Sequence, residues 1–143
     1  RSRGLELGLE RSISHRWQVS AGYAWQEAKI TRTTSAAPVG REAPLVPRHS
    51  FSLWNRYDMN QRLGLGLGVI ARSKSYASIS NQVRLPAYAR VDAAAFFKVA
   101  RHVELQLNVE NLLGAHYFPT AHNDNNIAPG APRTARLTLR FGF

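Results

Sequence analysis

The stretch from residue 103 to residue 110 decides the fold, and it reads Val103-Glu104-Leu105-Gln106-Leu107-Asn108-Val109-Glu110. Apolar and polar residues alternate strictly along it. Because successive side chains of a β-strand point to opposite faces, this period of two predicts a strand with one apolar and one polar face. An amphipathic helix would instead place apolar residues three and four positions apart.

The same alternation returns in six further segments, so the sequence predicts seven strands and an all-β fold. Each segment is close to the ~9–11 residues of a tilted strand that crosses a membrane. The six other predicted strands cover residues 5–10, 17–26, 50–57, 63–71, 90–99 and 134–143.

Short and long connections alternate between these strands. The long ones are rich in Ser, Thr, Asn, Ala, Pro and Gly, which is typical of loops. A bacterial outer-membrane barrel has this rhythm, with short turns on the periplasmic side and long loops outside. The short connections are Ser12–Arg16, Asp58–Arg62 and Ala100–His102, and the long ones are about Ala28–Pro47, Ser73–Ala87 and Leu112–Pro132.

Aromatic residues of the apolar face fall near the two ends of the predicted strands, while the strand middles are mostly Leu, Val and Ala. Two aromatic girdles around an aliphatic belt are expected where rings sit at the depth of the lipid headgroups. The short-turn band holds Trp17, Tyr57, Phe97, Phe141 and Phe143, and the long-loop band holds Tyr23, Trp25 and Phe51. We therefore favour an antiparallel, up-and-down transmembrane barrel over a soluble β-sandwich.

Length and composition exclude several other classes. None of the 143 residues is a cysteine, so a disulfide scaffold and a Cys-ligated zinc site are excluded. No apolar run approaches the ~20 residues of a membrane-spanning helix. Seven strands are fewer than the smallest complete barrel of the usual kind, and the chain opens on Arg1 without a starting Met. We expect a fragment, the C-terminal part of something larger.

The chain is strongly basic, with 19 Lys and Arg against 9 Asp and Glu and a formal net charge of +10. Such a balance is common in proteins that bind nucleic acid. The basic residues are nevertheless spread singly along the chain and form no patch or arm. Charge alone therefore leaves nucleic-acid binding and attraction of another anion open.

Particular motifs, in order along the chain, add a family resemblance. They are Gly4-Leu5-Glu6, Gly22-Tyr23-Ala24-Trp25, Val46-Pro47-Arg48-His49, Leu53-Trp54-Asn55-Arg56-Tyr57, Leu85-Pro86-Ala87-Tyr88-Ala89-Arg90-Val91-Asp92, Leu107-Asn108-Val109-Glu110-Asn111-Leu112-Leu113, Pro129-Gly130-Ala131-Pro132-Arg133 and Leu137-Thr138-Leu139-Arg140-Phe141-Gly142-Phe143. Together they resemble the C-terminal end of TonB-dependent outer-membrane receptors, the ferric-siderophore transporters. The stretch 117–127 most resembles catecholate-type siderophore receptors.

The resemblance implies a barrel of roughly 22 strands closed by an N-terminal plug. Residues 1–143 would be the C-terminal portion of that barrel, with the plug domain absent. It also implies a place in the bacterial outer membrane and a role in TonB-dependent uptake of ferric siderophores. The implied partners are the siderophore, outer-membrane lipid and lipopolysaccharide, the outer-membrane assembly machinery, and TonB through the missing N-terminal part.

Ligand contacts are expected from side chains near the long loops. A ferric catecholate is anionic and aromatic, so a binder needs cations and aromatic rings. Contact with anionic lipopolysaccharide is the other use of such cations. The candidates are Arg72, Tyr76, Tyr88, Arg90, Tyr117, His122, Asn123 and Arg133.

Three other groups have expected roles in the barrel. Leu137, Leu139, Phe141 and Phe143 resemble the terminal signal of assembly, because a free edge strand can pair with a partner's strand. Arginines 56, 90, 136 and 140 are expected to point into the lumen and to form cross-strand ion pairs, with Glu104 and Glu110 on the strand before the last two. Gly64, Gly66 and Gly68 leave a stripe without side chains, at which the plug would approach closely.

Catalysis and metal binding find little support. No serine lies in a G-x-S-x-G elbow, and there is no P-loop or dinucleotide fingerprint. Only His116 and His122, with Asp124 nearby, offer donors for a metal. The resemblance implies no cofactor, since the iron arrives already wrapped by the siderophore. We expect a protein that is not an enzyme.

Two alternatives stay open at this point. The chain is also compatible with another outer-membrane barrel, such as a porin or an adhesin. A soluble basic β-protein that binds nucleic acid should carry aromatic residues on its arginine-bearing face. Here only Trp54, Tyr88 and Phe96 do so, which counts against that alternative.

Overall fold

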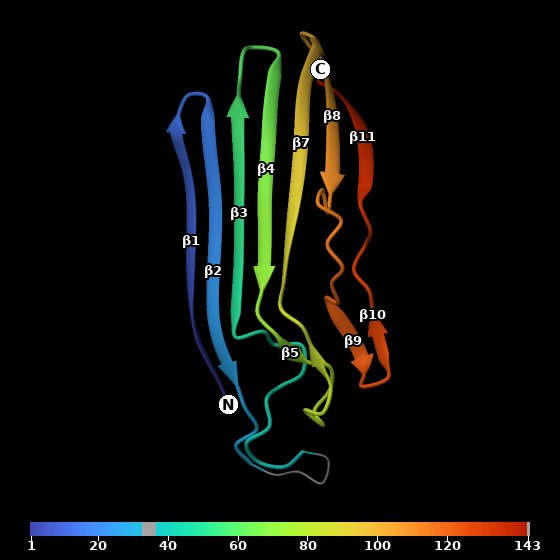
Figure 1. Cartoon of the computed structure of the whole chain (residues 1–143). Coiled ribbons are helices and arrows are strands. Elements are labelled where there is room, and N and C mark those ends of the chain that lie inside the picture. Colours follow the sequence, from blue (N-terminus) through green and yellow to red (C-terminus); the bar gives the residue numbers. More distant parts are fainter. Residues whose placement is uncertain (33–36, 143) are drawn as a thin grey trace.

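The computed structural model describes residues 1–32 and 37–142. Their long strands form one seven-stranded antiparallel sheet, and the long loops lie at one end of it (Figure 1). No helix in this part of the chain is long and apolar enough to cross a membrane. Each long strand pairs with the next long strand along the chain. The seven strands are β1 (Ser2–Ser14), β2 (Trp17–Ala28), β3 (His49–Asp58), β4 (Leu63–Arg72), β7 (Tyr88–Ala100), β8 (Val103–Glu110) and β11 (Thr134–Phe141).

All seven predicted strands are therefore present, and the predicted short and long connections lie at opposite ends of the sheet (Figure 1). The long connections are not plain loops, however. One contains the hairpin of β5 (Ser75–Tyr76) and β6 (Arg84–Leu85), and another that of β9 (Thr120–Asn123) and β10 (Asn126–Ala128). These strands are too short to leave a periodic signal in the sequence.

Apart from two irregularities at the short-turn end, after Ser12 and after Lys98, the register of the seven long strands places odd-numbered residues on one face of the sheet and even-numbered residues on the other. Leu67, for example, lies opposite Asn55 on β3 and Ala93 on β7, whereas its neighbour Gly66 lies opposite Arg56 and Ala94. We call the odd-numbered face the apolar face and the even-numbered face the polar face. A slip of one residue would exchange the two faces, so the alternating pattern fixes the register.

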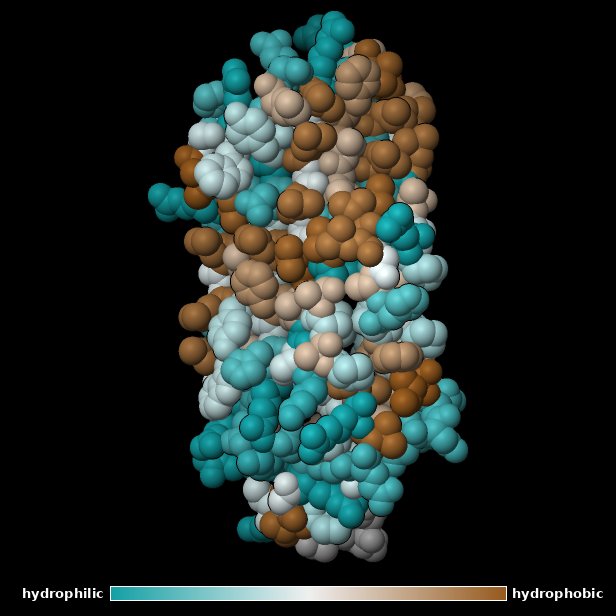
Figure 2. Space-filling model, in the orientation of Figure 1, coloured by the Kyte–Doolittle hydropathy of each residue, from teal (hydrophilic) through white to brown (hydrophobic). Residues whose placement is uncertain are grey.

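The sheet exposes its apolar side chains to the surroundings, which is the reverse of what a soluble protein does. Large side chains of the apolar face are open, with Leu67 51% and Leu137 64% exposed, while Phe96 on the polar face is only 7% exposed. Figure 2 shows hydrophobic atoms gathered over the strands and hydrophilic atoms over the long-loop end. A soluble sandwich would cover such a continuous apolar surface, whereas the wall of a membrane barrel presents it to lipid.

The glycine stripe on the polar face is covered from within the sheet. The indole of Trp54 on β3 lies across Gly66 and Gly68 of β4, so that a Cβ added at Gly66 would stand 2.5 Å from Trp54 Cζ2. The predicted close approach to the stripe is thus observed at these two glycines, with Trp54 as the approaching group, and approach of the plug stays a prediction. A neighbouring strand supplies the ring that approaches them.

Ion pairs on the polar face run along strands as well as between them. Arg56 pairs with Asp58 at 3.2 Å, and Arg90 pairs with Asp92 at 2.7 Å, each two residues ahead on its own strand. Among the ion pairs that these four predicted arginines form in the described residues, one crosses between strands. It joins Arg136 to Glu110 of β8 at 3.3 Å. The cross-strand prediction is therefore correct for Arg136 and wrong for Arg56 and Arg90, whose side chains reach a nearer carboxylate.

The predicted girdle residues that the structure describes lie on the apolar face, near the two ends of the strands. Trp17 and Tyr57 are register partners at the short-turn end, where Phe97 lies opposite Leu63. Tyr23 lies opposite Phe51 near the long-loop end, and Trp25 follows two residues later. Their contact with lipid headgroups stays a prediction. Phe143 of the short-turn band falls outside the described residues.

Candidate functional site

The long-loop end holds the best candidate site, because three connections and both small hairpins meet there (Figure 1). A cavity of about 300 Å³ opens between the connection that precedes β3 and the one that follows β4. It is lined by Glu42, Arg48, His49, Ser73, Lys74, Ser75, Tyr76 and Arg84. We call it the loop cavity.

The loop cavity is cationic and contains an aromatic ring. The Arg84 guanidinium lies over the ring of Tyr76, 5.5 Å from its centroid. Arg48 is held by Glu42 at 2.5 Å, while Lys74 and Arg84 are solvent-exposed. An exposed cation beside a ring is suited to an anionic, aromatic ligand.

Sequence reasoning found only Tyr76 among the residues of this cavity. It missed Arg48, Lys74 and Arg84, and it also missed His49. These residues lie in separate connections, and no spacing in the sequence shows that the two connections meet. The alternation of charged and small residues in Arg72-Ser73-Lys74-Ser75 was a local signal that could have pointed to Lys74.

Three predicted ligand residues come together where the last long connection meets the start of β7: Tyr88, Arg90 and Tyr117 form one cluster. Arg90 Nη1 donates to Tyr117 Oη at 3.1 Å, and the rings of Tyr88 and Tyr117 stand 4.7 Å apart. The ring of Tyr117 also presses on Gly130, where an added Cβ would lie 2.2 Å from it. Tyr117 is only 6% exposed. Its burial gives it a part in packing the loop against the wall.

Asn111 fastens the same loop to the sheet. It is 1% exposed, and its φ of 53° lies in the left-handed region that asparagine tolerates. Its N–H donates to Asp92 Oδ1 at 2.8 Å, and its Nδ2 donates to the carbonyls of Ala115 and Ala131 at 2.9 and 3.1 Å. Its Oδ1 accepts from Ala115 N–H at 2.8 Å. Every polar group of the side chain is thus paired.

The remaining predicted ligand residues are spread around the loop end. Arg72 ends β4 opposite Tyr88, and the two line a shallow hollow with His49. His122 and Asn123 lie exposed on β9, and Arg133 lies exposed just before β11. Ligand contact by any of the eight predicted residues stays a prediction.

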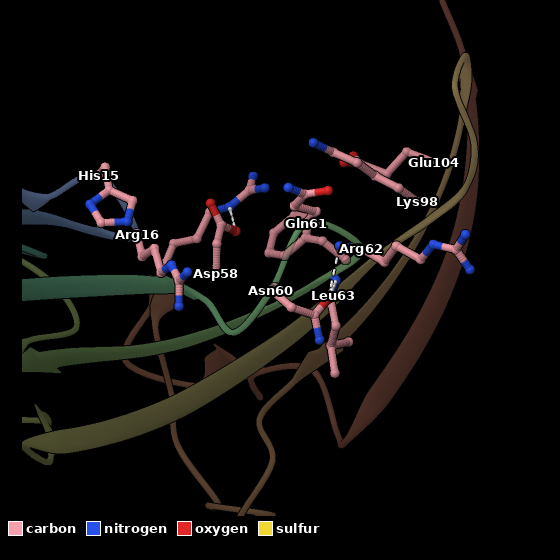
Figure 3. Close-up of a pocket in the computed structure, with 12 residues that line it drawn as sticks. His15, Arg16, Asp58, Asn60, Gln61, Arg62, Leu63, Lys98 and Glu104 are labelled. Carbon is pink, nitrogen blue, oxygen red and sulfur yellow. Dashed lines mark hydrogen bonds and ion pairs between the residues drawn. The ribbon is translucent and has the colours of Figure 1, made fainter.

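A second hollow of about 280 Å³ lies at the opposite, short-turn end of the polar face (Figure 3). It is lined by more basic than acidic residues, namely Arg16, Arg56, Arg62 and Lys98 against Asp58 and Glu104. Asn60 Oδ1 caps the turn by accepting from the backbone N–H groups of Arg62 and Leu63 at 2.8 and 2.9 Å. This hollow is a feature of the wall, remote from the loops.

Metal binding gains no support from the geometry. No cluster of three or more potential metal-ligating side chains occurs in residues 1–32 and 37–142. Asp124 accepts a hydrogen bond from the Ser80 hydroxyl.

An exposed apolar face, with aromatic rings near both ends and long loops at one end, defines the wall of a transmembrane β-barrel. The family model described as "TonB dependent receptor-like, beta-barrel" matches residues 1–112. The chain therefore belongs to the TonB-dependent receptors, which are β-barrel proteins of the outer membrane of Gram-negative bacteria. The predictions of family, barrel fold and location are confirmed. The family consists of receptors and transporters rather than enzymes.

Individual relatives agree with this assignment. The probable TonB-dependent receptor BfrD of Bordetella pertussis is 34% identical over 150 residues, which cover 98% of this chain and 20% of BfrD. The catecholate siderophore receptor Fiu of Escherichia coli K12 is 30% identical, over 100% of this chain and 20% of Fiu. The chain spans about a fifth of the length of the curated relatives it matches.

Solved structures show the same architecture. The crystal structure of the siderophore receptor PiuA from Acinetobacter baumannii superposes with a TM-score of 0.88 at 31% identity, over 98% of this chain and 21% of PiuA. The closed form of Fiu, described as a ferric-catecholate import receptor, gives a TM-score of 0.87 at 28% identity, over 99% of this chain and 21% of Fiu.

Proposed function

We propose that residues 1–143 form the C-terminal part of the barrel of a receptor that takes up ferric siderophores with energy delivered through TonB. In this proposal the plug domain and the segment that contacts TonB belong to another part of the polypeptide. Family membership supports the receptor class, and two relatives, PiuA and Fiu, carry siderophore receptor in their names. No cofactor of the protein itself is needed, because the iron arrives as part of the ligand.

The loop cavity is the observation that carries the choice of ligand. Lys74 and Arg84 are exposed cations that line a space of about 300 Å³, and Arg84 lies over the ring of Tyr76. An iron(III) tris-catecholate has three aromatic rings and a net negative charge, so it matches both features. A ligand of this size would also touch neighbouring loops, for which His122, Asn123 and Arg133 are the candidates.

The test is equilibrium binding of iron(III) tris-catecholate to the full-length receptor, with variants Lys74→Ala and Arg84→Ala. Loss of one charge-assisted contact is expected to weaken binding by roughly tenfold in each variant. Arg101→Ala is the matched control, because Arg101 is an exposed arginine in the turn at the other end of the barrel. Unchanged affinity in both loop variants would remove the loop cavity from the ligand site.

We also propose that the outer leaflet contacts the rim of the apolar face. Arg3 and Lys29 flank Glu27 there at 2.6 Å each, beyond the aromatic band of Tyr23 and Trp25. This depth and charge suit the phosphates of lipopolysaccharide. Arg3→Ala with Lys29→Ala should reduce co-purified lipopolysaccharide, and an unchanged amount would count against this contact.

The assembly role proposed for β11 is supported by its open apolar face. Leu137, Leu139 and Phe141 are 64%, 50% and 64% exposed, and all three lie on the side that other barrels of this kind present to lipid. Phe143, the last residue of the predicted signal, lies outside the described residues.

A further inference from the structure

The loop cavity is built from two connections that are distant in sequence. Glu42 and Arg48 come from the connection before β3, while Lys74, Tyr76 and Arg84 come from the connection after β4 and its hairpin. The cavity therefore exists only while these two connections stay in register with each other.

Asn81 is the side chain that makes two hydrogen bonds between them, and Arg41 adds one from its Nη1 to the C=O of Ile79 at 3.2 Å. Its Oδ1 accepts the backbone N–H of Glu42 at 2.7 Å, and its Nδ2 donates to the backbone C=O of Glu42 at 2.9 Å. On its other side, the Glu42 segment forms a β-bridge with Lys29 at the end of β2. The amide of Asn81 thus takes the place of a neighbouring strand for one residue.

The backbone of Asn81 is shaped for this contact. Its φ of 53° lies in the left-handed region, and its Nδ2 also donates to Ser78 C=O at 3.2 Å. Leu45 has a φ of 60° at the same junction, where its N–H donates to Tyr76 C=O at 2.8 Å. A left-handed leucine costs of order 1–2 kcal/mol and persists only when its surroundings hold it.

The third connection is attached to the second by a small core. Ala77, Leu85 and Ala121 are buried together, with Val83 and Ile127 packed against them. The Ser80 hydroxyl, one residue before Asn81, donates to Asp124 Oδ2 in the β9–β10 hairpin. The segment around Asn81 is therefore attached to the β9–β10 hairpin on one side, and its other side contacts the connection that contains Glu42.

We propose that Asn81 is a positioning residue for the ligand site: its double hydrogen bond to Glu42 locks the first long connection onto the second and so shapes the loop cavity. This inference rests on the proposed function for its consequence in binding, but the lock itself does not depend on any ligand. Removal of the Asn81 amide loosens the attachment at Glu42 and leaves Lys74, Tyr76 and Arg84 all present.

The first test is hydrogen–deuterium exchange of the full-length receptor without ligand, in the variant Asn81→Gly. Glycine keeps the left-handed backbone at no steric cost, so the change removes the amide alone. Exchange of the Glu42 N–H is expected to rise roughly tenfold, because its acceptor is lost. Asn81→Asp keeps an acceptor for that N–H and should retain part of the protection. Unchanged exchange at Glu42 in Asn81→Gly would overturn the lock.

The second test is binding of iron(III) tris-catecholate to the same variants. Asn81→Gly should weaken binding by roughly tenfold, and Asn81→Asp should fall between it and the unmodified receptor. Asn125→Gly is the control, because Asn125 is an exposed asparagine at the tip of the neighbouring hairpin. Faster Glu42 exchange with unchanged binding would overturn the positioning role. Unchanged binding in Lys74→Ala and Arg84→Ala would instead refute the proposed ligand site and leave the lock standing.

Discussion

The contact between Trp54 and the glycine stripe makes the sharpest prediction about stability. An added Cβ at Gly66 would lie 2.5 Å from Trp54 Cζ2 and 3.0 Å from its Cη2, with Ala94 Cβ at 3.4 Å on the other side. Ordinary contacts of a Cβ begin near 3.4 Å. The indole must therefore move by almost 1 Å in the variant Gly66→Ala, with Ala94 limiting any compensating shift of the strand.

Overpacking of this kind costs about 1–3 kcal/mol. Replacing a strand glycine by alanine returns about 0.5–1 kcal/mol through backbone entropy. We therefore expect Gly66→Ala to lower the free energy of unfolding by about 1–2 kcal/mol. Urea-induced unfolding of the full-length receptor in lipid vesicles, followed by the gel mobility of the folded barrel, measures it.

A double-mutant cycle with Trp54→Ala isolates the clash from every other effect. In the Trp54→Ala background the added methyl group has no ring to meet, so Gly66→Ala should become neutral or stabilising there. The two substitutions should then couple by more than about 1 kcal/mol, as expected of residues in contact. Additive effects of the two substitutions would refute the packing of Trp54 against the glycine stripe.

Three further changes have expected outcomes. Asn111→Gly keeps the left-handed backbone but removes three side-chain hydrogen bonds, so it should lower the free energy of unfolding by about 2–4 kcal/mol. Proteolysis should then cleave within residues 111–133 first, and resistance equal to that of the unmodified receptor would contradict this. Phe141→Ala should slow appearance of the folded barrel in the outer membrane, measured by pulse labelling, and an unchanged rate would contradict the assembly role. Leu67→Arg places a cation on the apolar face and should cost about 2–4 kcal/mol in vesicles, whereas Ser20→Arg on the polar face should cost less than about 1 kcal/mol.

The long strands could be predicted from sequence because one physical rule governs them all. A residue such as Leu105 or Leu137 must face lipid, and its neighbours must not. Apolar and polar residues therefore alternate in the sequence with a period of two. The hairpins β5–β6 and β9–β10 could not be found in this way. Their strands are two to four residues long, and they are held by the contact of Ala77 and Leu85 with Ala121.

The candidate site was harder to predict for a related reason. Residue chemistry correctly placed Tyr76 and Arg90 near the long-loop end. The sequence did not show which residues of other connections lie next to them. Arg90 meets Tyr117 only because the last loop folds back through Asn111. Asn81 gave no signal at all, since a single polar residue in a loop usually makes a turn. Its contact with Glu42 spans 39 residues of sequence.

The central claim is that the odd-numbered face meets lipid and the even-numbered face lines the barrel. These 143 residues contain no cysteine, so single cysteines with spin labels can be placed at positions 63–72 along β4 of a full-length receptor from whose remaining part any cysteine has been removed. In lipid vesicles we predict that oxygen, which concentrates in lipid, relaxes labels at odd positions and that a water-soluble nickel reagent relaxes those at even positions. Accessibility without a period of two along β4, or with the opposite phase, would contradict the account.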